Sequence, residues 1–133
     1  MIQPLFVFSD WAFLVLRIAL GVVMIYHGFP KLKNLKATGE AFSGMGFRPG
    51  VFWAWIVGIL EGIGGVFLVI GLLTQVVSLL LAIEFLVILL KLKKFRNMKE
   101  YELDLIIFTS LLVLVTVGGG VVSIDGFFGI FLY

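Results

Sequence analysis

The chain has 133 residues, of which 62% are hydrophobic and 14% are charged, with a formal net charge of +2. A mean hydropathy of +1.20 lies far outside the range of soluble proteins and indicates one integral membrane domain, residues 1–133. The small net charge argues against a nucleic-acid partner. The absence of cysteine excludes disulfides, thiol catalysis and thiolate-held metal clusters, so any redox role requires a bound cofactor or a partner protein.

Four apolar stretches come close to the length of about 20 residues that a transmembrane helix needs. They cover residues 11–28, 51–70, 75–90 and 103–117. No Lys or Arg occurs in residues 1–10, so we interpret the first stretch as a retained span and not as a signal peptide. The sequence therefore predicts an all-α fold, an integral membrane four-helix bundle.

The connections between these stretches differ in character. Segment 29–50 is polar and basic, and we expect a loop with one short interfacial helix there, after the first helix ends near Gly28 and Pro30. The uncharged turn 71–74 is short, so the second and third helices must pack as an antiparallel hairpin. The tail, residues 118–133, is too short to span the membrane, and we expect it to fold back against the bundle at the interface.

The basic residues give the chain an orientation. All of them except Arg17 lie in or beside the loop between the first two spans and the loop between the last two. The positive-inside rule then places both basic loops in the cytoplasm and both termini outside. This describes a multi-pass protein of the cell membrane whose first partner is the lipid bilayer, and a homo-oligomer stays open.

The stretch from Gly58 to Thr74 contains a carboxylate, Glu61, inside an apolar run. At about 100° per residue, one narrow arc of this helix holds Ala54, Gly58, Glu61, Gly62 and Gly65. Small residues at this spacing allow helices to approach closely in lipid. We therefore expect this helix to pack tightly against a neighbour and Glu61 to face into the bundle.

Three charged residues, Arg17, Glu61 and Glu84, fall at mid-membrane depth, where each would cost about 2.5–3.5 kcal/mol if it faced lipid. We expect them to face inward and to meet, with Asp125 of the tail also within reach of Arg17. One interpretation is that these charges only hold the helices in register. The other is that they line a small polar cavity, open to the outer leaflet, that binds a quinone, a lipid headgroup or protons.

A second polar layer is expected near the cytoplasmic end, formed by His27, Glu102 and Asp104. His27 and Asp104 come at similar depth and could pair, whereas a packing role for a lone interfacial histidine is the alternative. Acidic residues at the start of a helix also complement its dipole. The carboxylates do not show metal-ligand spacing, so no metal site is expected.

Five segments together resemble the DoxX family of small four-helix membrane proteins. They are LRIALGVVMIYHGFPKL, GILEGIGGVFLVIGLLT, AIEFLVILLK, YELDLIIFTSLLVL and GGGVVSID, in this order. The chain departs from the family pattern at Val121 and Val122, where the family often has Arg-Tyr. The resemblance implies association with membrane oxidoreductase systems, including subunits of quinone-linked thiosulfate or terminal oxidase complexes.

Two functions remain open at this point. The first is a membrane subunit of a quinone-linked oxidoreductase system, which uses a buried Arg/Glu site for a quinone or other small ligand and works with soluble oxidoreductase subunits. No covalently bound cofactor is expected. The alternative is a non-catalytic membrane anchor, or a carrier of a lipid or small molecule, in which the buried charges are structural.

Overall fold

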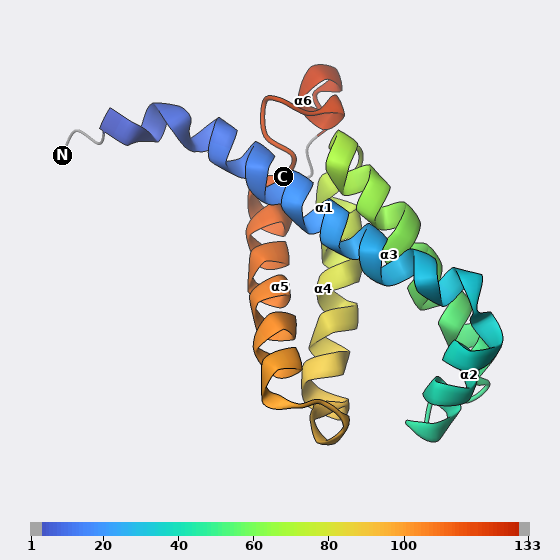
Figure 1. Ribbon diagram of the computed structural model, residues 1–133. Coiled ribbons are helices and arrows are strands. Elements are labelled where there is room, and N and C mark those ends of the chain that lie inside the picture. Colours follow the sequence, from blue (N-terminus) through green and yellow to red (C-terminus); the bar gives the residue numbers. More distant parts are fainter. Residues whose placement is uncertain (1–3, 131–133) are drawn as a thin grey trace.

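A computed structural model describes residues 4–130, which contain helices and no strand (Figure 1). The elements in chain order are a 3-10 helix η1 (Pro4–Phe8), α1 (Ser9–Lys33), α2 (Leu35–Gly44), α3 (Gly50–Ile70), α4 (Thr74–Lys91), a 3-10 turn η2 (Lys93–Phe95), α5 (Met98–Val117) and α6 (Ile124–Phe128). The predicted all-α fold is confirmed for this part of the chain. The last residues of the predicted tail, 131–133, lie outside the described range.

Three stretches of the described chain are long and apolar enough to cross a membrane: Pro4–Lys33, Gly50–Ile70 and Thr74–Lys91. The sequence predicts a fourth span at 103–117, which lies within α5. This helix has 20 residues, but its first two turns carry several charges in the sequence MKEYELD. These charges exclude α5 from the three stretches, although the rest of the helix is apolar.

Helix α1 is longer than predicted, because it continues through Pro30 and ends at Lys33. A proline inside a helix removes one hydrogen bond and its ring clashes with the carbonyl four residues earlier, but the helix can continue where other contacts hold the next turn. The last turn is held by tertiary contacts, since Gly28 packs on α3 and Lys31 pairs with Glu61. Asn34 then donates its backbone N–H to the Pro30 carbonyl at 3.2 Å and closes the helix.

Helices α1 and α3 cross with their backbones in contact, as the small-residue arc of α3 predicts. A Cβ atom added to Gly21 would lie 2.6 Å from the Gly65 carbonyl oxygen, and one added to Gly65 would lie 2.7 Å from the Gly21 carbonyl oxygen. Further along the crossing, a Cβ on Gly28 would meet the Gly62 nitrogen at 2.2 Å. Glycines therefore permit this close approach.

Helices α4 and α5 form the second pair and lie side by side (Figure 1). Large apolar side chains fill the space between the two pairs: Met24, Leu68, Leu81, Phe85, Ile107, Leu111 and Leu114. Asn97 and Glu100 form a reciprocal capping box at the start of α5, which begins the helix five residues before the predicted span. Toward the end of the molecule that carries the basic loops, the α1–α3 pair with α2 diverges from the α4–α5 pair.

Candidate functional site

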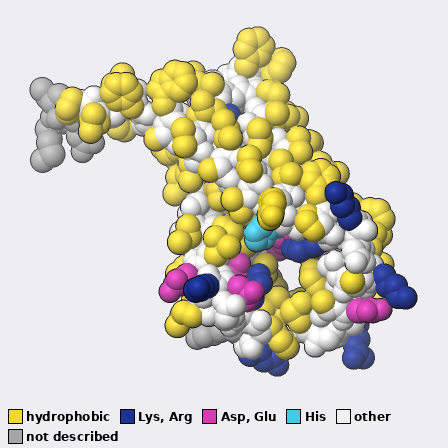
Figure 2. Space-filling view, in the orientation of Figure 1, with side chains coloured by type: hydrophobic (Ala, Val, Ile, Leu, Met, Phe, Trp, Pro, Cys, Tyr) yellow, Lys and Arg dark blue, Asp and Glu magenta, His cyan; other side chains and the backbone are white. Residues whose placement is uncertain are grey.

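A cavity of about 510 Å³ lies where the two helix pairs diverge. Its apolar wall comes from α2, α3, α4, η2 and the loops beside them: Phe42, Met45, Phe47, Trp53, Ile56, Val57, Leu60, Leu80, Ile83, Val87, Ile88, Leu92 and Phe95. Lys31, Glu84, Arg96 and Glu100 are its charged lining residues. Figure 2 shows acidic and basic side chains gathered around a hollow at the lower end of an otherwise largely hydrophobic face. The volume falls in the range typical of small-molecule sites, about 300–1,000 Å³.

Glu84 of α4 is the deepest charged group of the cavity wall. Both of its carboxylate oxygens are buried, and neither accepts a hydrogen bond from a donor among the described residues, although the carboxylate of Glu61 lies close enough to share a proton with it. The charged side chains close enough to act on it are Glu61 and Lys31. Buried polar groups are normally hydrogen-bonded, so an unpartnered carboxylate on a cavity wall indicates a site that a proton or a ligand completes.

Glu61 of α3 lies beside Glu84 but has its own partner. The ammonium group of Lys31 lies 2.5 Å from the Glu61 Oε2 atom, and Glu61 is only 1% exposed. This pair joins α1 to α3 one turn beyond the Gly28–Gly62 contact. The glycine crossing brings the two backbones close enough for the pair to form, and Lys31 neutralises the buried charge of Glu61.

Arg96 holds a second cluster of charges at the loop end of the cavity. Its Nε atom lies 3.0 Å from the Oδ2 atom of Asp104, which is 2% exposed, and its Nη1 atom lies 4.0 Å from Glu100 Oε2. His27 is near enough to Asp104 to interact electrostatically. The expected His27–Asp104 proximity is therefore present, while Arg96 supplies the ion pair. Glu102 is exposed and does not belong to this layer.

Arg17 lies at the opposite end of the bundle, about 21 Å from Lys31 along α1 at about 1.5 Å per residue. It is 2% exposed, and its guanidinium donates to the Gly119 carbonyl and, at 2.8 Å, to the Val122 carbonyl. Arg17 thus binds the backbone of the tail. The prediction that Arg17 meets Glu61 and Glu84 is wrong, because the α1 register that places Lys31 beside Glu61 places Arg17 beside the hairpin turn.

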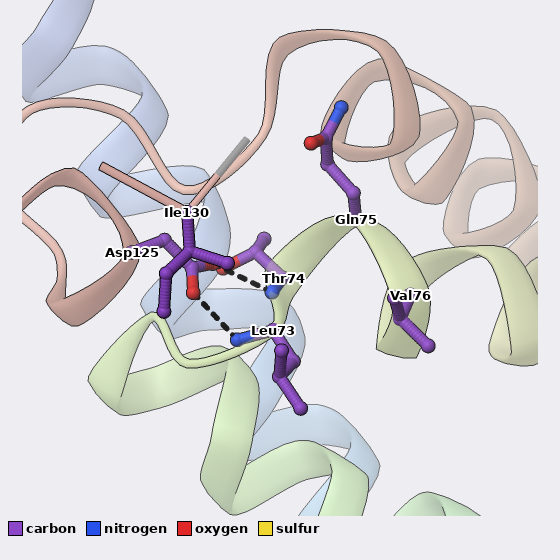
Figure 3. A pocket seen from close by; sticks show the side chains of 6 residues that line it. All are labelled: Leu73, Thr74, Gln75, Val76, Asp125 and Ile130. Carbon is purple, nitrogen blue, oxygen red and sulfur yellow. Dashed lines mark hydrogen bonds between the residues drawn. The ribbon is translucent and has the colours of Figure 1, made fainter. Parts of the chain in front are cut away.

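Asp125 completes this end of the molecule by capping α4 from the tail. Its two carboxylate oxygens accept the backbone N–H groups of Leu73 and Thr74, each at 2.7 Å (Figure 3). Its own N–H donates to the Gly71 carbonyl at 2.8 Å. Leu73 has a φ of 50°, an unfavourable left-handed conformation for a leucine, so Asp125 also holds a strained turn. The tail therefore folds back onto the bundle, as predicted.

Only a small pocket lies beside this cap, with a volume of about 40 Å³ and lined by Leu73, Thr74, Gln75, Val76, Asp125 and Ile130 (Figure 3). Such a space holds little more than a water molecule. One of the two interpretations of Arg17, Glu61 and Glu84 has them line a small polar cavity that is open to the outer leaflet. The large cavity instead lies at the end of the basic loops, because the helix pairs diverge there.

Replacing Asp125 by alanine is expected to lower the melting temperature of the purified protein. The change removes both acceptors at the start of α4, and loss of a helix cap costs about 0.5–2 kcal/mol. Differential scanning fluorimetry in detergent measures the shift. Asp10→Ala is the matched control, because Asp10 lies in the first turn of α1 and is partly exposed. Equal melting temperatures for the two variants would contradict the capping role.

Sequence reasoning missed two groups of the cavity, Lys31 and Arg96. Lys31 shares a wheel face of α1 with Arg17 and Gly28, so a helical wheel places it on the buried side. Its position beyond Pro30 hides this signal, because the helix is predicted to end there. Arg96 carries no sequence signal that distinguishes it from the other basic residues of its loop.

The chain is similar to known proteins over most of its length. The family model described as DoxX matches residues 12–94, which is more than half of the chain. The chain belongs to the DoxX family. A relative in Bacillus subtilis (strain 168), named "Putative oxidoreductase CatD", is 29% identical over 116 residues, which cover 86% of this chain and 84% of the relative. No solved structure matches the chain.

Membership of the DoxX family and the apolar helices identify the chain as a membrane protein. The matched region begins in α1 and ends in η2, so it includes Lys31, Glu61 and Glu84. It therefore contains the Lys31–Glu61 pair and most of the cavity wall. The cluster around Arg96 and Asp104, and the tail that Arg17 binds, lie beyond it.

Proposed function

We propose that this DoxX protein is a membrane subunit of a quinone-linked oxidoreductase system and that its cavity holds the quinone headgroup beside Glu84. The observation that carries this proposal is the unpartnered, buried carboxylate of Glu84 on the wall of a cavity of about 510 Å³. The name of the Bacillus subtilis relative, which includes the word oxidoreductase, supports the same class of function.

The cavity suits a flat, mostly apolar ring with a few polar atoms. Phe47 and Trp53 lie edge to face with ring centroids 6.2 Å apart and give the wall a rigid aromatic side. The aliphatic side chains of α4 provide the opposite side. When bound, a quinone would supply two-electron redox chemistry that also exchanges protons. Glu84 can hold a proton at its carboxylate and donate a hydrogen bond to a ligand oxygen.

The Lys31–Glu61 pair prepares Glu84 for this role. Lys31 neutralises Glu61, so Glu84 is the carboxylate of the pair that is free to gain or lose a proton as the ligand changes. The chain has no cysteine. We therefore propose that soluble oxidoreductase subunits deliver electrons at the loop end, where the cavity lies.

We also propose a topology with four spans, formed by α1, α3, α4 and α5, in the cell membrane. Both basic loops border the same cavity and thus lie at the same end of the bundle. With these loops in the cytoplasm, the cavity opens toward the cytoplasmic side, and the tail and the α3–α4 turn lie outside. A homo-oligomer is compatible with this arrangement.

The carrier function is the second candidate, because a cavity beside the lipid-facing helices can also hold a small molecule that is not reduced. The contacts of the buried charges support both candidates in part. Arg17 and Asp125 make contacts that stabilise the tail and the hairpin turn, whereas Glu84 lacks such contacts. A carrier would bind the quinone or another ligand, but a variant that no longer binds this ligand would leave oxidoreductase turnover unchanged.

We expect a short-chain ubiquinone to quench the fluorescence of Trp53, and Glu84→Gln to weaken that binding. The protonated carboxyl group that donates to the ligand is neutral, and loss of one neutral hydrogen bond costs about 0.5–1.5 kcal/mol, which is about a twofold to tenfold increase in Kd. The measurement is a fluorescence titration of the purified chain in lipid nanodiscs. Quinol-dependent turnover of membranes that contain each variant then separates a subunit from a carrier.

Glu102→Gln is the matched control for this titration, because Glu102 is exposed and does not line the cavity. It should bind the quinone as the wild type does. Trp53→Phe should remove most of the quenching, because the quenched fluorophore is lost. The variant should still bind the quinone in an assay that does not depend on tryptophan fluorescence. The proposal would be wrong if wild-type protein showed no saturable quenching, or if Glu84→Gln and Glu102→Gln had the same Kd.

A further inference from the structure

Carboxylates outnumber cations around the cavity among the described side chains. Four carboxylates lie in or directly beside it, whereas its permanently cationic groups are Lys31 and Arg96 of the lining and Lys94, which lies over the ring of Phe95 at 5.0 Å. Lys31 is held by Glu61 at 2.5 Å, and Arg96 is shared between Asp104 and Glu100. Each cation of the lining is thus already paired, and Glu84 is left without one.

Aromatic side chains form part of the same cavity wall. Phe42, Phe47 and Trp53 form a connected series, with ring centroids 6.4 Å apart for the first pair and 6.2 Å for the second. Phe95 adds a ring from η2. Aromatic faces attract cations, and the attraction is strongest where water is excluded. A buried carboxylate and aromatic rings that line one cavity are the chemistry that recognises an organic cation.

We propose that this cavity binds a hydrophobic organic cation, an amine or onium compound with one or more rings, which pairs with Glu84 in place of a proton. The aliphatic side chains of α4 would hold its apolar part, and the aromatic rings would contact its charged centre. The pairing of Lys31 and Arg96 with carboxylates removes the repulsion that unpaired cations would cause. This binding does not require a quinone.

Competition with a proton follows from the burial of Glu84. A buried carboxylate without a counter-charge is stable only if a proton or a cation neutralises it. The groups that face it from the packed helices are Lys31 of α1 and Glu61 of α3, with Arg96 and Glu100 farther toward the loops. Since Lys31 and Glu61 neutralise each other, the exchange on Glu84 is one proton for one cation.

The test uses tetraphenylphosphonium as the probe and the purified full chain in detergent, with isothermal titration calorimetry across near-neutral pH. We expect saturable binding whose Kd falls about tenfold for each unit rise in pH, together with release of one proton per cation. Proton release is read from the dependence of the binding enthalpy on the buffer. Tetraphenylborate, which has the same shape and the opposite charge, should show no saturable binding.

Glu84→Gln should abolish tetraphenylphosphonium binding, whereas Glu40→Gln should not change it, because Glu40 is an exposed residue of α2 outside the cavity wall. Circular dichroism and melting temperature establish that Glu84→Gln is folded. If that variant does not fold, Glu84→Asp provides the second test, and its Kd should rise at least tenfold. Equal binding by Glu84→Gln and the wild type, or a Kd independent of pH, would overturn the proposal. A quinone titration of the same samples tests the proposed redox role independently of cation binding.

Discussion

Replacing Arg17 by leucine is expected to cause the largest loss of stability of any single charge removal in this protein. The guanidinium is the donor to two backbone carbonyls of the tail, those of Gly119 and Val122. Gly119 is buried, and an unsatisfied buried carbonyl costs about 1–3 kcal/mol, whereas Val122 is exposed and loses only an ordinary hydrogen bond of about 0.5–1.5 kcal/mol, so the expected loss is about 1.5–4.5 kcal/mol in the free energy of unfolding. Asp125 would also lose the nearby positive charge that acts on it, as Arg17 and Asp125 interact electrostatically.

Thermal unfolding in detergent, followed by circular dichroism, measures this loss. Arg48→Leu is the matched control, because Arg48 is exposed in the loop before α3 and should change the melting temperature little. Limited proteolysis should cleave the tail after residue 117 faster in Arg17→Leu. Ligand binding per folded molecule should persist, since the cavity lies at the other end of α1. A stable Arg17→Leu variant that no longer binds ligand would show that Arg17 is not mainly structural.

Replacing Gly28 by alanine is expected to separate α1 from α3. The added Cβ would lie 2.2 Å from the Gly62 nitrogen and 2.7 Å from the Gly62 Cα atom, and backbone atoms cannot move aside as a flexible side chain can. Overpacking of this kind costs about 1–3 kcal/mol. The displacement would also pull Lys31, one turn further along α1, away from Glu61. We therefore expect both lower stability and weaker quinone binding.

The facing glycine of the same crossing provides the control. A Cβ on Gly62 would find its nearest neighbour, Leu32 Cδ1, at 3.6 Å, which is an ordinary contact. Alanine is favoured over glycine inside a helix by about 1 kcal/mol, so Gly62→Ala should be neutral or stabilising. Melting temperatures of the two variants test this asymmetry. If Gly62→Ala were as harmful as Gly28→Ala, the geometry of the crossing described above would be wrong.

Arg17 and Lys31 have separate roles at two points along α1. Near its start, α1 fixes the tail through Arg17, and near its end it positions Lys31 beside Glu61. The glycine contacts between these points set the distance between α1 and α3 at both ends. A shift in this crossing therefore couples the stability of the tail region to the shape of the cavity.

Much of the fold follows from the sequence by simple physical rules. Hydropathy identifies the apolar helices, because the energy of placing polar groups in lipid is large compared with any local preference. The glycines of α3 and the carboxylate of Glu61 share one arc, which predicts a close helix crossing and an inward carboxylate, and both are found. The short turn at 71–74 predicts the hairpin, and the structure has α3 ending at Ile70 and α4 beginning at Thr74.

The partners of the buried charges, by contrast, were decided only by the tertiary structure. Depth along a helix places Arg17, Glu61 and Glu84 in one layer, but a charge pairs with the group that the helix crossing brings within reach. Because α1 continues past Pro30, Lys31 lies beside Glu61 at the crossing and pairs with it. Arg17 lies farther from Glu61 along α1 and binds the tail. The cavity also depends on the angle at which the two helix pairs diverge, which arises from packing of side chains distant in sequence. The residue types and their faces were therefore set by the sequence, whereas the unpartnered state of Glu84 is a property of the packed helices.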